Sequence, residues 1–288
     1  MSKTSVFTRR DFLRSTTAAA TLAATGSPLL SAAATTASVL VIRDQKAMLD
    51  DYAVDAEVLK KMVSATVMRV TGEKTPKAAW LSLVKPTDIV GLVPTPHLNP
   101  THPEVVATVR EQLREAGIPD ANIRDAQGNN DVVERCTALI SLPGLKAHWL
   151  TGIGTVLKNY IMFSGRPSSY HNEDSSKLGE IWNLPHVKGK TKLILVDALR
   201  PLCDKGPQPD PRYMWPYKGL IAGTDPVAVE RICLKVITAK RHALRGETWL
   251  LSPPPFCIEA ADKQFHAGVS DLKRITVETA GWTQDLLL

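Results

Sequence analysis

The chain has 288 residues, of which 44% are hydrophobic and 22% are charged, values close to those of an average globular protein. These values exclude a disordered or fibrous protein, and the length allows one large domain with a sizeable core. The net charge is +6, and residues 1–34 carry four of the cationic side chains against a single aspartate. The remainder has no long run of lysine and arginine, so we expect no nucleic-acid partner.

The first 34 residues are predicted to be an export signal. Arg9 and Arg10 precede a polar residue, an aromatic residue and a leucine, an order that resembles the twin-arginine export motif. Residues 15–30 are weakly apolar, and small residues at 32–34 offer cleavage at Ala34, with Ala37 as an alternative. The motif implies the twin-arginine translocation machinery as a partner and the periplasm, or another extracytoplasmic space, as the destination. Retention of the apolar stretch as a membrane anchor stays open.

No later apolar run is long enough to cross a membrane. We therefore expect no stable membrane span once the signal has been cleaved.

The four cysteines do not predict a metal centre. Cys136, Cys203, Cys233 and Cys257 form no C-x-x-C pair and lack the spacing of a zinc site or a ferredoxin-type cluster. An iron–sulfur cluster or a divalent metal is possible but is not supported by cysteine spacing, and the cofactor stays unknown. Two disulfides are an open alternative, but four separate, partly buried thiols are the expected arrangement.

After the signal, short apolar strands alternate with helices. Strands are predicted over residues 39–42, 88–93, 122–125, 138–142, 193–196 and 219–222. Helices are predicted over residues 55–70 and 151–163, from a Thr101 cap to Gly117, and from an Asp225 cap to Ile237. This alternation predicts an α/β fold in which helices cover both faces of a mostly parallel sheet within a single domain. Residues 35–87 would form an N-terminal extension of the domain, residues 88–237 its core, and residues 238–288 a C-terminal extension packed on the core.

Polar side chains follow the ends of the predicted strands. Ligands of open α/β sheets bind beyond the carboxyl ends of the strands, so these side chains form the candidate site. Among candidate catalytic residues, Lys146 would hold an anionic group, His148 would exchange a proton, and Asp197 would orient His148 or a metal. The candidate ligand-binding residues are Asp125, Lys158, Asn159, His171 and Asp225.

Several of these residues have a structural alternative. Asp225 is more often a helix cap than a ligand, and Asp197 could satisfy loop amides. Lys158 could be a solvated helix residue, and the loop that carries His171 could be exposed. His97 and His102, near the start of a predicted helix, are expected in loop and capping roles.

Other kinds of site have weaker support. A metal held by His148, His171 and a carboxylate stays open, because these residues would meet only in the fold. A serine hydrolase would need a G-x-S-x-G elbow, which we do not find, and Gly152-x-Gly154 lacks the third glycine of the dinucleotide fingerprint.

Several ordered segments between residues 88 and 237 share the pattern of one known family. They are residues 142–148, Thr151-Gly152, Lys158-Asn159, residues 196–198, Gly206-Pro207 and residues 222–230. Together they resemble the domain-of-unknown-function 362 family, some of whose members are iron–sulfur proteins or carry twin-arginine signals. The resemblance implies little chemistry, because no general activity is established for the family.

This chain departs from the family pattern at three points. Val93-Pro94-Thr95 stands where many relatives have Lys-x-Asn, which removes one positive group from the expected site. Glu230 stands where Asp is usual, and the ferredoxin-like cysteine module of some relatives is absent. The expected function is an exported enzyme, redox- or metal-linked, that acts on a small anionic ligand at the strand ends. The alternative is a non-catalytic periplasmic protein that binds a small ligand or is an accessory to another complex.

Overall fold

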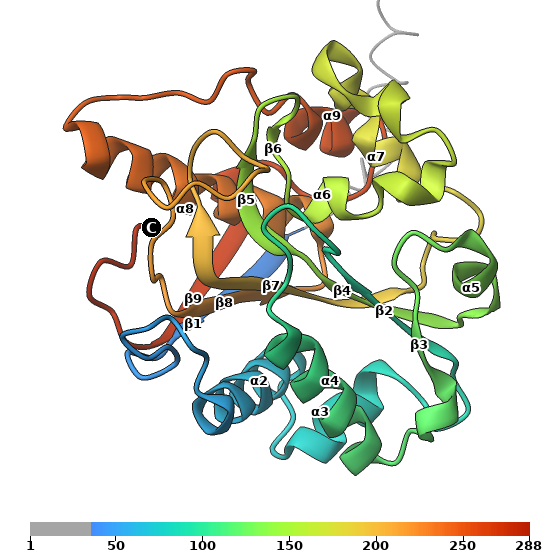
Figure 1. The fold of residues 1–288 in the computed structure, drawn as a ribbon. Coiled ribbons are helices and arrows are strands. Elements are labelled where there is room, and N and C mark those ends of the chain that lie inside the picture. The colour runs from blue at the N-terminus through green and yellow to red at the C-terminus, as the bar shows by residue number, and fades with distance from the viewer. Residues whose placement is uncertain (1–35) are drawn as a thin grey trace, which may run out of the picture. The chain divides into compact units, whose positions relative to one another are not determined.

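The structure, a computed structural model, describes residues 36–288, so the predicted signal lies outside the described residues (Figure 1). Five strand pairs are parallel and three are antiparallel within the described residues. The main sheet has the order β3-β2-β4-β7-β8-β1-β9, and β5 and β6 extend it beside β7. The strands are β1 (Ala37–Arg43), β2 (Val90–Pro94), β3 (Ile123–Asp125), β4 (Ala138–Leu142), β5 (Gly144–His148), β6 (Gly152–Ile153), β7 (Thr191–Leu202), β8 (Gly219–Gly223) and β9 (Ile275–Gly281).

Helices cover both faces of this sheet. On the lower face in Figure 1 lie α2 (Ala56–Thr71), α3 (Pro76–Leu83) and α4 (Pro103–Ala116). On the upper face lie α6 (Val156–Asn159), α7 (Leu178–Ile181), α8 (Pro226–Arg245) and α9 (Cys257–Lys263), and α5 (Asn130–Arg135) lies near β3. The predicted α/β fold with a mostly parallel sheet is therefore confirmed. No helix among residues 36–288 is long and apolar enough to cross a membrane.

The two apolar layers follow from the alternation of side chains along each strand. On β1, Leu40 and Ile42 face the core under α2, whereas Val39 and Val41 face the core under α8. The strand is therefore buried on both faces, as expected for a strand that lies between two others in an α/β sheet.

β7 is the longest strand and joins two parts of the molecule. Its first part pairs in parallel with β4, and its second part pairs with β5 through Gly144 opposite Asp197 and Lys146 opposite Leu202. Pro143 cannot donate to the ladder, but its carbonyl accepts a hydrogen bond of 2.8 Å from the Asp197 amide. β4 thus ends at Leu142, as predicted, and after Pro143 the chain continues as the separate strand β5.

The predicted helix over residues 151–163 is the largest error in the expected elements. The segment instead forms β6, the four-residue helix α6 and a 3-10 helix, Ile161–Ser164. Gly152 has a φ of +74°, and a Cβ there would lie 2.6 Å from the Pro253 carbonyl oxygen. This left-handed residue, packed against a distant loop, breaks the helical pattern that the apolar spacing suggested.

Two predicted helix caps have different outcomes. Asp225 caps α8, because its Oδ1 accepts hydrogen bonds of 2.9 Å from the amides of Val227 and Ala228. Thr101 does not cap α4: its hydroxyl donates to the Leu142 carbonyl and accepts from the Thr95 amide, and His102 takes the cap position. The Thr101 side chain thus ties the loop after β2 to the end of β4.

Arg43, at the end of β1, fixes the C-terminal segment to the sheet. Its guanidinium is buried between the rings of Tyr217 and Trp282, with 4.2 Å to each ring centroid. It also donates hydrogen bonds to the carbonyl oxygens of Tyr217 and Gln284. Arg43 therefore links β1, the loop before β8 and the segment after β9.

We expect Arg43→Met to lower the free energy of unfolding by about 3 kcal/mol, because a buried carbonyl and a partly buried one lose a charged donor and two rings lose a cation. Urea unfolding followed by circular dichroism measures this change. Arg69→Met is the matched control, because the Arg69–Glu278 pair is half exposed and should change stability by less than about 1 kcal/mol. Equal effects of the two substitutions would contradict this role of Arg43.

Candidate functional site

A cavity of about 210 Å³ opens above the sheet between the loop after β2, the β5–β6 hairpin and α6. We call it the Lys146 cavity. Its lining combines cationic, imidazole and apolar side chains with no carboxylate. The lining residues are Thr95, Pro96, His97, Leu98, Gln127, Lys146, His148, Gly154, Lys158, Asn159, Ile161, Met162, Pro167, His171 and Pro207.

Lys146 reaches this cavity from the middle of β5. Its backbone is held on both sides, by the ladder to β7 and by a hydrogen bond of 3.0 Å from the Gly154 amide to its carbonyl. Its Nζ donates hydrogen bonds of 2.8 and 2.9 Å to the carbonyl oxygens of Leu98 and Asn99. The residue is 4% exposed, so the amine is removed from bulk water except through the cavity.

Lys158 and Asn159 come from α6, whose position depends on a buried carboxylate. Glu230 on α8 is 1% exposed, and its Oε2 accepts a hydrogen bond of 2.8 Å from the Leu157 amide. The α6 backbone amides favour the charged carboxylate, but burial outweighs them and raises the pKa of Glu230 to about 7. The Asn159 side chain donates a hydrogen bond of 2.7 Å to the Val93 carbonyl, and this bond joins α6 to the end of β2. Glu230, where the family usually has Asp, thus acts as an N-terminal partner for the helix that carries Lys158.

The two lysines form a cationic site without a counter-ion. Lys158 Nζ makes no hydrogen bond or ion pair with any residue in the described range, and neither lysine has a carboxylate oxygen within 4.0 Å. Burial, with the charge of Lys158 adding to it and that of Asp197 opposing it, lowers the pKa of Lys146 to about 7. Burial also lowers the pKa of Lys158 to about 8. The cavity therefore holds positive charge that no carboxylate of residues 36–288 compensates.

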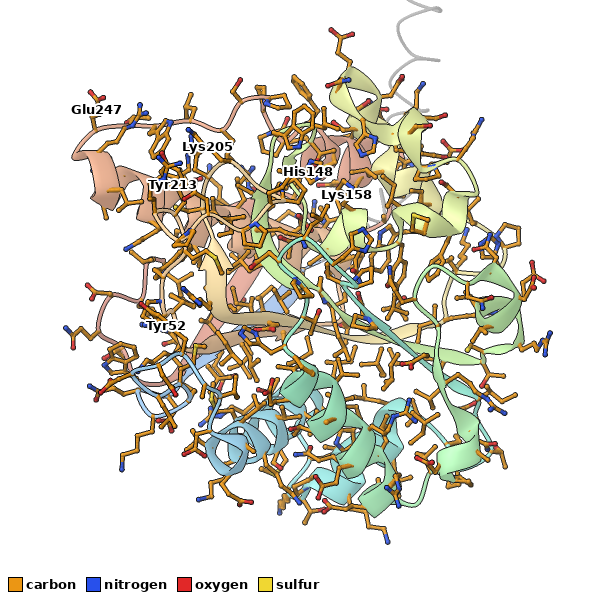
Figure 2. All side chains as sticks on the ribbon, in the orientation of Figure 1. Tyr52, His148, Lys158, Lys205, Tyr213 and Glu247 are labelled. Carbon is orange, nitrogen blue, oxygen red and sulfur yellow. The ribbon has the colours of Figure 1, made fainter. Side chains whose placement is uncertain are left out.

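His148 is a neutral member of the site. Burial, followed by the nearby charges of Lys158, His171 and Lys146, lowers the pKa of His148 to about 3. Its Nδ1 accepts a hydrogen bond of 3.1 Å from the Leu150 amide, so the neutral ring carries its proton on Nε2. Figure 2 shows His148 and Lys158 on the same side of the sheet, and the His171 ring stacks on His148 at 5.9 Å between centroids. Burial also lowers the pKa of His171.

Asp197 lies in the middle of β7 and binds a different imidazole. Its Oδ2 accepts hydrogen bonds from the His102 amide at 2.7 Å and from His102 Nδ1 at 2.6 Å. Burial opposes protonation of His102, but the hydrogen bond and charge of Asp197 outweigh it and raise the pKa of His102. Asp197 therefore orients His102 and not His148, contrary to the expectation from the sequence.

Asp225 and Asp125 do not join the Lys146 cavity. β8 runs antiparallel to β7, which is itself parallel to β4. Asp225 follows the carboxyl end of β8 and therefore lies at the opposite end of the strands from the carboxyl end of β4. The expectation that it meets Lys146 requires β8 to run parallel to β7, and the antiparallel pairing of these strands overturns it. Asp125 is exposed on the edge strand β3, where Arg110 lies 3.8 Å away.

The donor set does not fit a resident metal ion or iron–sulfur cluster. Within residues 36–288, no three His, Cys, Asp or Glu side chains gather closely enough to hold a metal. All four cysteines are buried, free thiols on separate elements, which confirms the expectation of four unpaired thiols.

Sequence reasoning missed part of the cavity wall. His97 and Leu98 lie in the proline-rich loop after β2, and Gln127 and Met162 follow β3 and α6. The three prolines at 94, 96 and 100 were the signal in the sequence that this loop could form part of the wall. Proline lacks the N–H that would extend the strand, and the loop instead contacts Lys146 of β5 through the carbonyls of Leu98 and Asn99. Gly154 was noted only as a poor nucleotide motif. A Cβ there would lie 3.0 Å from His148, so its lack of a side chain makes room for the imidazole.

We expect the free energy of unfolding to rise less steeply with pH in Lys146→Met than in the wild type. The pKa of Lys146 falls from 10.5 to about 7 on folding, so between these values the unfolded chain binds more protons and the free energy of unfolding rises with pH. The wild-type slope between about pH 7 and pH 9 should exceed that of the variant by up to about 1.4 kcal/mol per pH unit. Urea unfolding across this range measures both slopes. Lys177→Met, at an exposed position, is the control, and parallel curves for wild type and Lys146→Met would refute buried titration.

Comparison with known proteins places the central part of this chain in one family. Residues 129–235 match the family model described as "Domain of unknown function (DUF362)". The match covers α5 to the first half of α8, and with it Lys146, His148, Lys158 and Glu230, but not the loop after β2. No curated protein and no solved structure matches the chain. Residues 129–235 thus match the domain-of-unknown-function 362 family, the family that the ordered motifs resemble.

Proposed function

We propose that the protein binds a small organic anion in the Lys146 cavity. The observation that carries this proposal is the pair of buried amines with no carboxylate in the cavity wall. A buried cation is costly unless it is paired, so the protonated cavity is completed by an anion from outside the chain. Asp197 does not serve as that partner, because its carboxylate is occupied by His102 and the Leu199 amide.

The size and the rim of the cavity limit the ligand. A volume of about 210 Å³ lies below the usual range of about 300–1,000 Å³ for drug-sized ligands, which favours an anion of few heavy atoms. Leu98 and Met162 are exposed apolar residues at the lining, and Ile161 adds a buried one. These contacts favour a short organic carboxylate over a fully hydrated inorganic ion.

The imidazole favours an enzyme over a pure binding protein. Neutral His148 presents an Nε2–H, which can donate to a carbonyl or carboxylate oxygen without adding another buried charge. A binding protein for anions would gain more from a charged donor. We therefore propose that the protein acts on the anion it binds, and that the non-catalytic binding protein is the alternative.

We expect acetate, lactate and pyruvate to bind wild-type protein in isothermal titration calorimetry. The affinity should fall as the pH rises from about 6 to about 9, because Lys146 and Lys158 lose their protons with pKa values of about 7 and about 8. Lys158→Gln should weaken binding by about tenfold or more, the loss of roughly one charge-assisted contact.

Lys177→Gln removes an exposed lysine outside the cavity and should leave the affinity unchanged. Equal affinity in the Lys158 and Lys177 variants, or an affinity that does not change up to about pH 9, would rule out the Lys146 cavity as an anion site.

We also propose that the protein is exported by the twin-arginine route. The support is Arg9-Arg10 and the following apolar stretch, which lie outside the described residues. Cleavage at Ala34 would leave β1 whole, whereas Ala37 is the first residue of β1 and pairs with Ile275. We therefore favour Ala34.

The full chain should be found outside the cytoplasm with a shortened N-terminus, and Arg9→Lys/Arg10→Lys should leave it uncleaved in the cytoplasm. Cell fractionation and intact mass measurement test both statements. Export of the double variant at the wild-type level would disprove the twin-arginine route, and a mature chain that begins after Ala37 would disprove cleavage at Ala34.

A further inference from the structure

We propose that Lys146 is a nucleophile whose amine condenses with the carbonyl carbon of a small oxo acid to form an imine, while Lys158 holds the carboxylate of the same molecule. This inference rests on the proposed function, because it assumes that the anion occupies the Lys146 cavity. It adds the reacting atom and the class of substrate, a short carboxylic acid that also carries an aldehyde or ketone carbonyl.

The hydrogen bonds of Lys146 leave one direction free. A neutral amine has two hydrogens and one lone pair, arranged roughly as a tetrahedron. Two backbone carbonyls, of Leu98 and Asn99, accept from Nζ at 2.8 and 2.9 Å, which is the full donor capacity of the neutral amine. Because Lys146 lines the cavity, the remaining direction, that of the lone pair, is the one in which a ligand can approach. A protonated amine would instead point its third N–H in this same direction, into a cavity whose wall offers no carboxylate.

The surroundings of Lys146 favour the neutral amine at physiological pH. The side chain is buried on β5, and Lys158 adds a positive charge from α6 across the same cavity. Burial and a neighbouring cation are the two conditions that activate lysine as a nucleophile. The pKa of about 7 that results leaves about half of the Lys146 amines unprotonated near neutral pH.

The other members of the cavity supply the remaining contacts for a carbonyl substrate. Lys158 has no partner of its own within residues 36–288 and is free to bind the carboxylate. The low pKa of His148 keeps its ring neutral, and the Nε2–H of this neutral ring can donate to the carbonyl oxygen and polarise it. The Asn159 amide is already bound to Val93 and takes no part in the reaction.

The step balances without an oxidant or a reductant. The Lys146 lone pair forms the N–C bond while the carbonyl π electrons move to oxygen, which gives a carbinolamine after proton transfer. The C–O bond then breaks, and the oxygen leaves as water with one hydrogen from nitrogen and one proton from solvent. The nitrogen keeps one hydrogen and the positive charge of a protonated imine. That N–H can still donate to one of the two loop carbonyls.

Trapping with borohydride tests this inference on the full chain. Wild-type protein is incubated with pyruvate near pH 7, sodium borohydride is added, and the labelled lysine is found by peptide mass spectrometry. We expect a reduced pyruvate adduct on Lys146, at least tenfold above that on partly exposed Lys60 or exposed Lys177. We also expect competition by acetate, which binds as an anion but has no ketone carbonyl.

Three variants separate nucleophile, carboxylate partner and structural role. Lys146→Arg keeps a cation for the two carbonyls but should abolish the adduct, and Lys158→Gln should require at least tenfold more pyruvate for the same labelling. Lys177→Gln should label like wild type. Circular dichroism and urea unfolding verify that each variant is folded, and if Lys146→Arg does not fold, the labelled position in wild type decides alone.

The outcomes distinguish this inference from the proposed function. An adduct on Lys146 that acetate suppresses supports both. Pyruvate that binds by calorimetry without labelling Lys146, or labels Lys158 instead, overturns the nucleophile and leaves the anion site standing. Absence of both binding and labelling overturns both.

Discussion

The site depends on the ladder that β7 makes with two successive strands. β4 pairs with the first part of β7, the chain turns at Pro143, and β5 resumes pairing with the same strand at Asp197. This continuation carries Lys146 and His148 above the sheet, where the β5–β6 hairpin can face α6 and the loop after β2. If β5 were a free loop, its backbone amides would need water, and a buried lysine could not keep a fixed position. The strand therefore makes it possible to hold an amine away from solvent.

Keeping two amines in a poorly hydrated wall costs stability, and the fold offsets that cost nearby. The loop carbonyls of Leu98 and Asn99 bind Lys146, and buried Glu230 binds the start of α6. Glu230 does not neutralise the lysines directly. Its carboxylate accepts from backbone amides of α6, which positions Lys158. The ammonium group of Lys158 stays unpaired. Structures that keep such unpaired groups usually do so for function, since a carboxylate in the wall would have been more stable.

The fold class could be predicted from the sequence because it depends on local patterns. The apolar runs of β1, β2, β4 and β8 and the Asp225 cap are legible within a few residues. Strand direction is not local, and the antiparallel course of β8 removed Asp225 from the site. Pairing partners are not local either, so Asp197 was assigned to His148 when His102 is the imidazole within reach. Lys146, His148, Lys158, Asn159 and His171 do line one cavity, because the strand-end rule needs only that the chain return to one end of the sheet.

Two lysines that share one cavity titrate as a pair, and the shared proton decides which ligand fits. With both amines protonated, the cavity carries two positive charges and suits a dianion. With one proton, that proton favours Lys158, whose pKa is higher, while Lys146 is neutral. A monocarboxylate held by Lys158 then leaves the cavity electrically neutral, and the amine beside it keeps its lone pair. The singly protonated state thus matches the proposed substrate, which has one carboxylate and one carbonyl. Only in that state is Lys158 charged for the carboxylate while Lys146 is neutral for attack on the carbonyl. The desolvation that weakens anion binding at high pH is therefore also what the proposed imine formation needs.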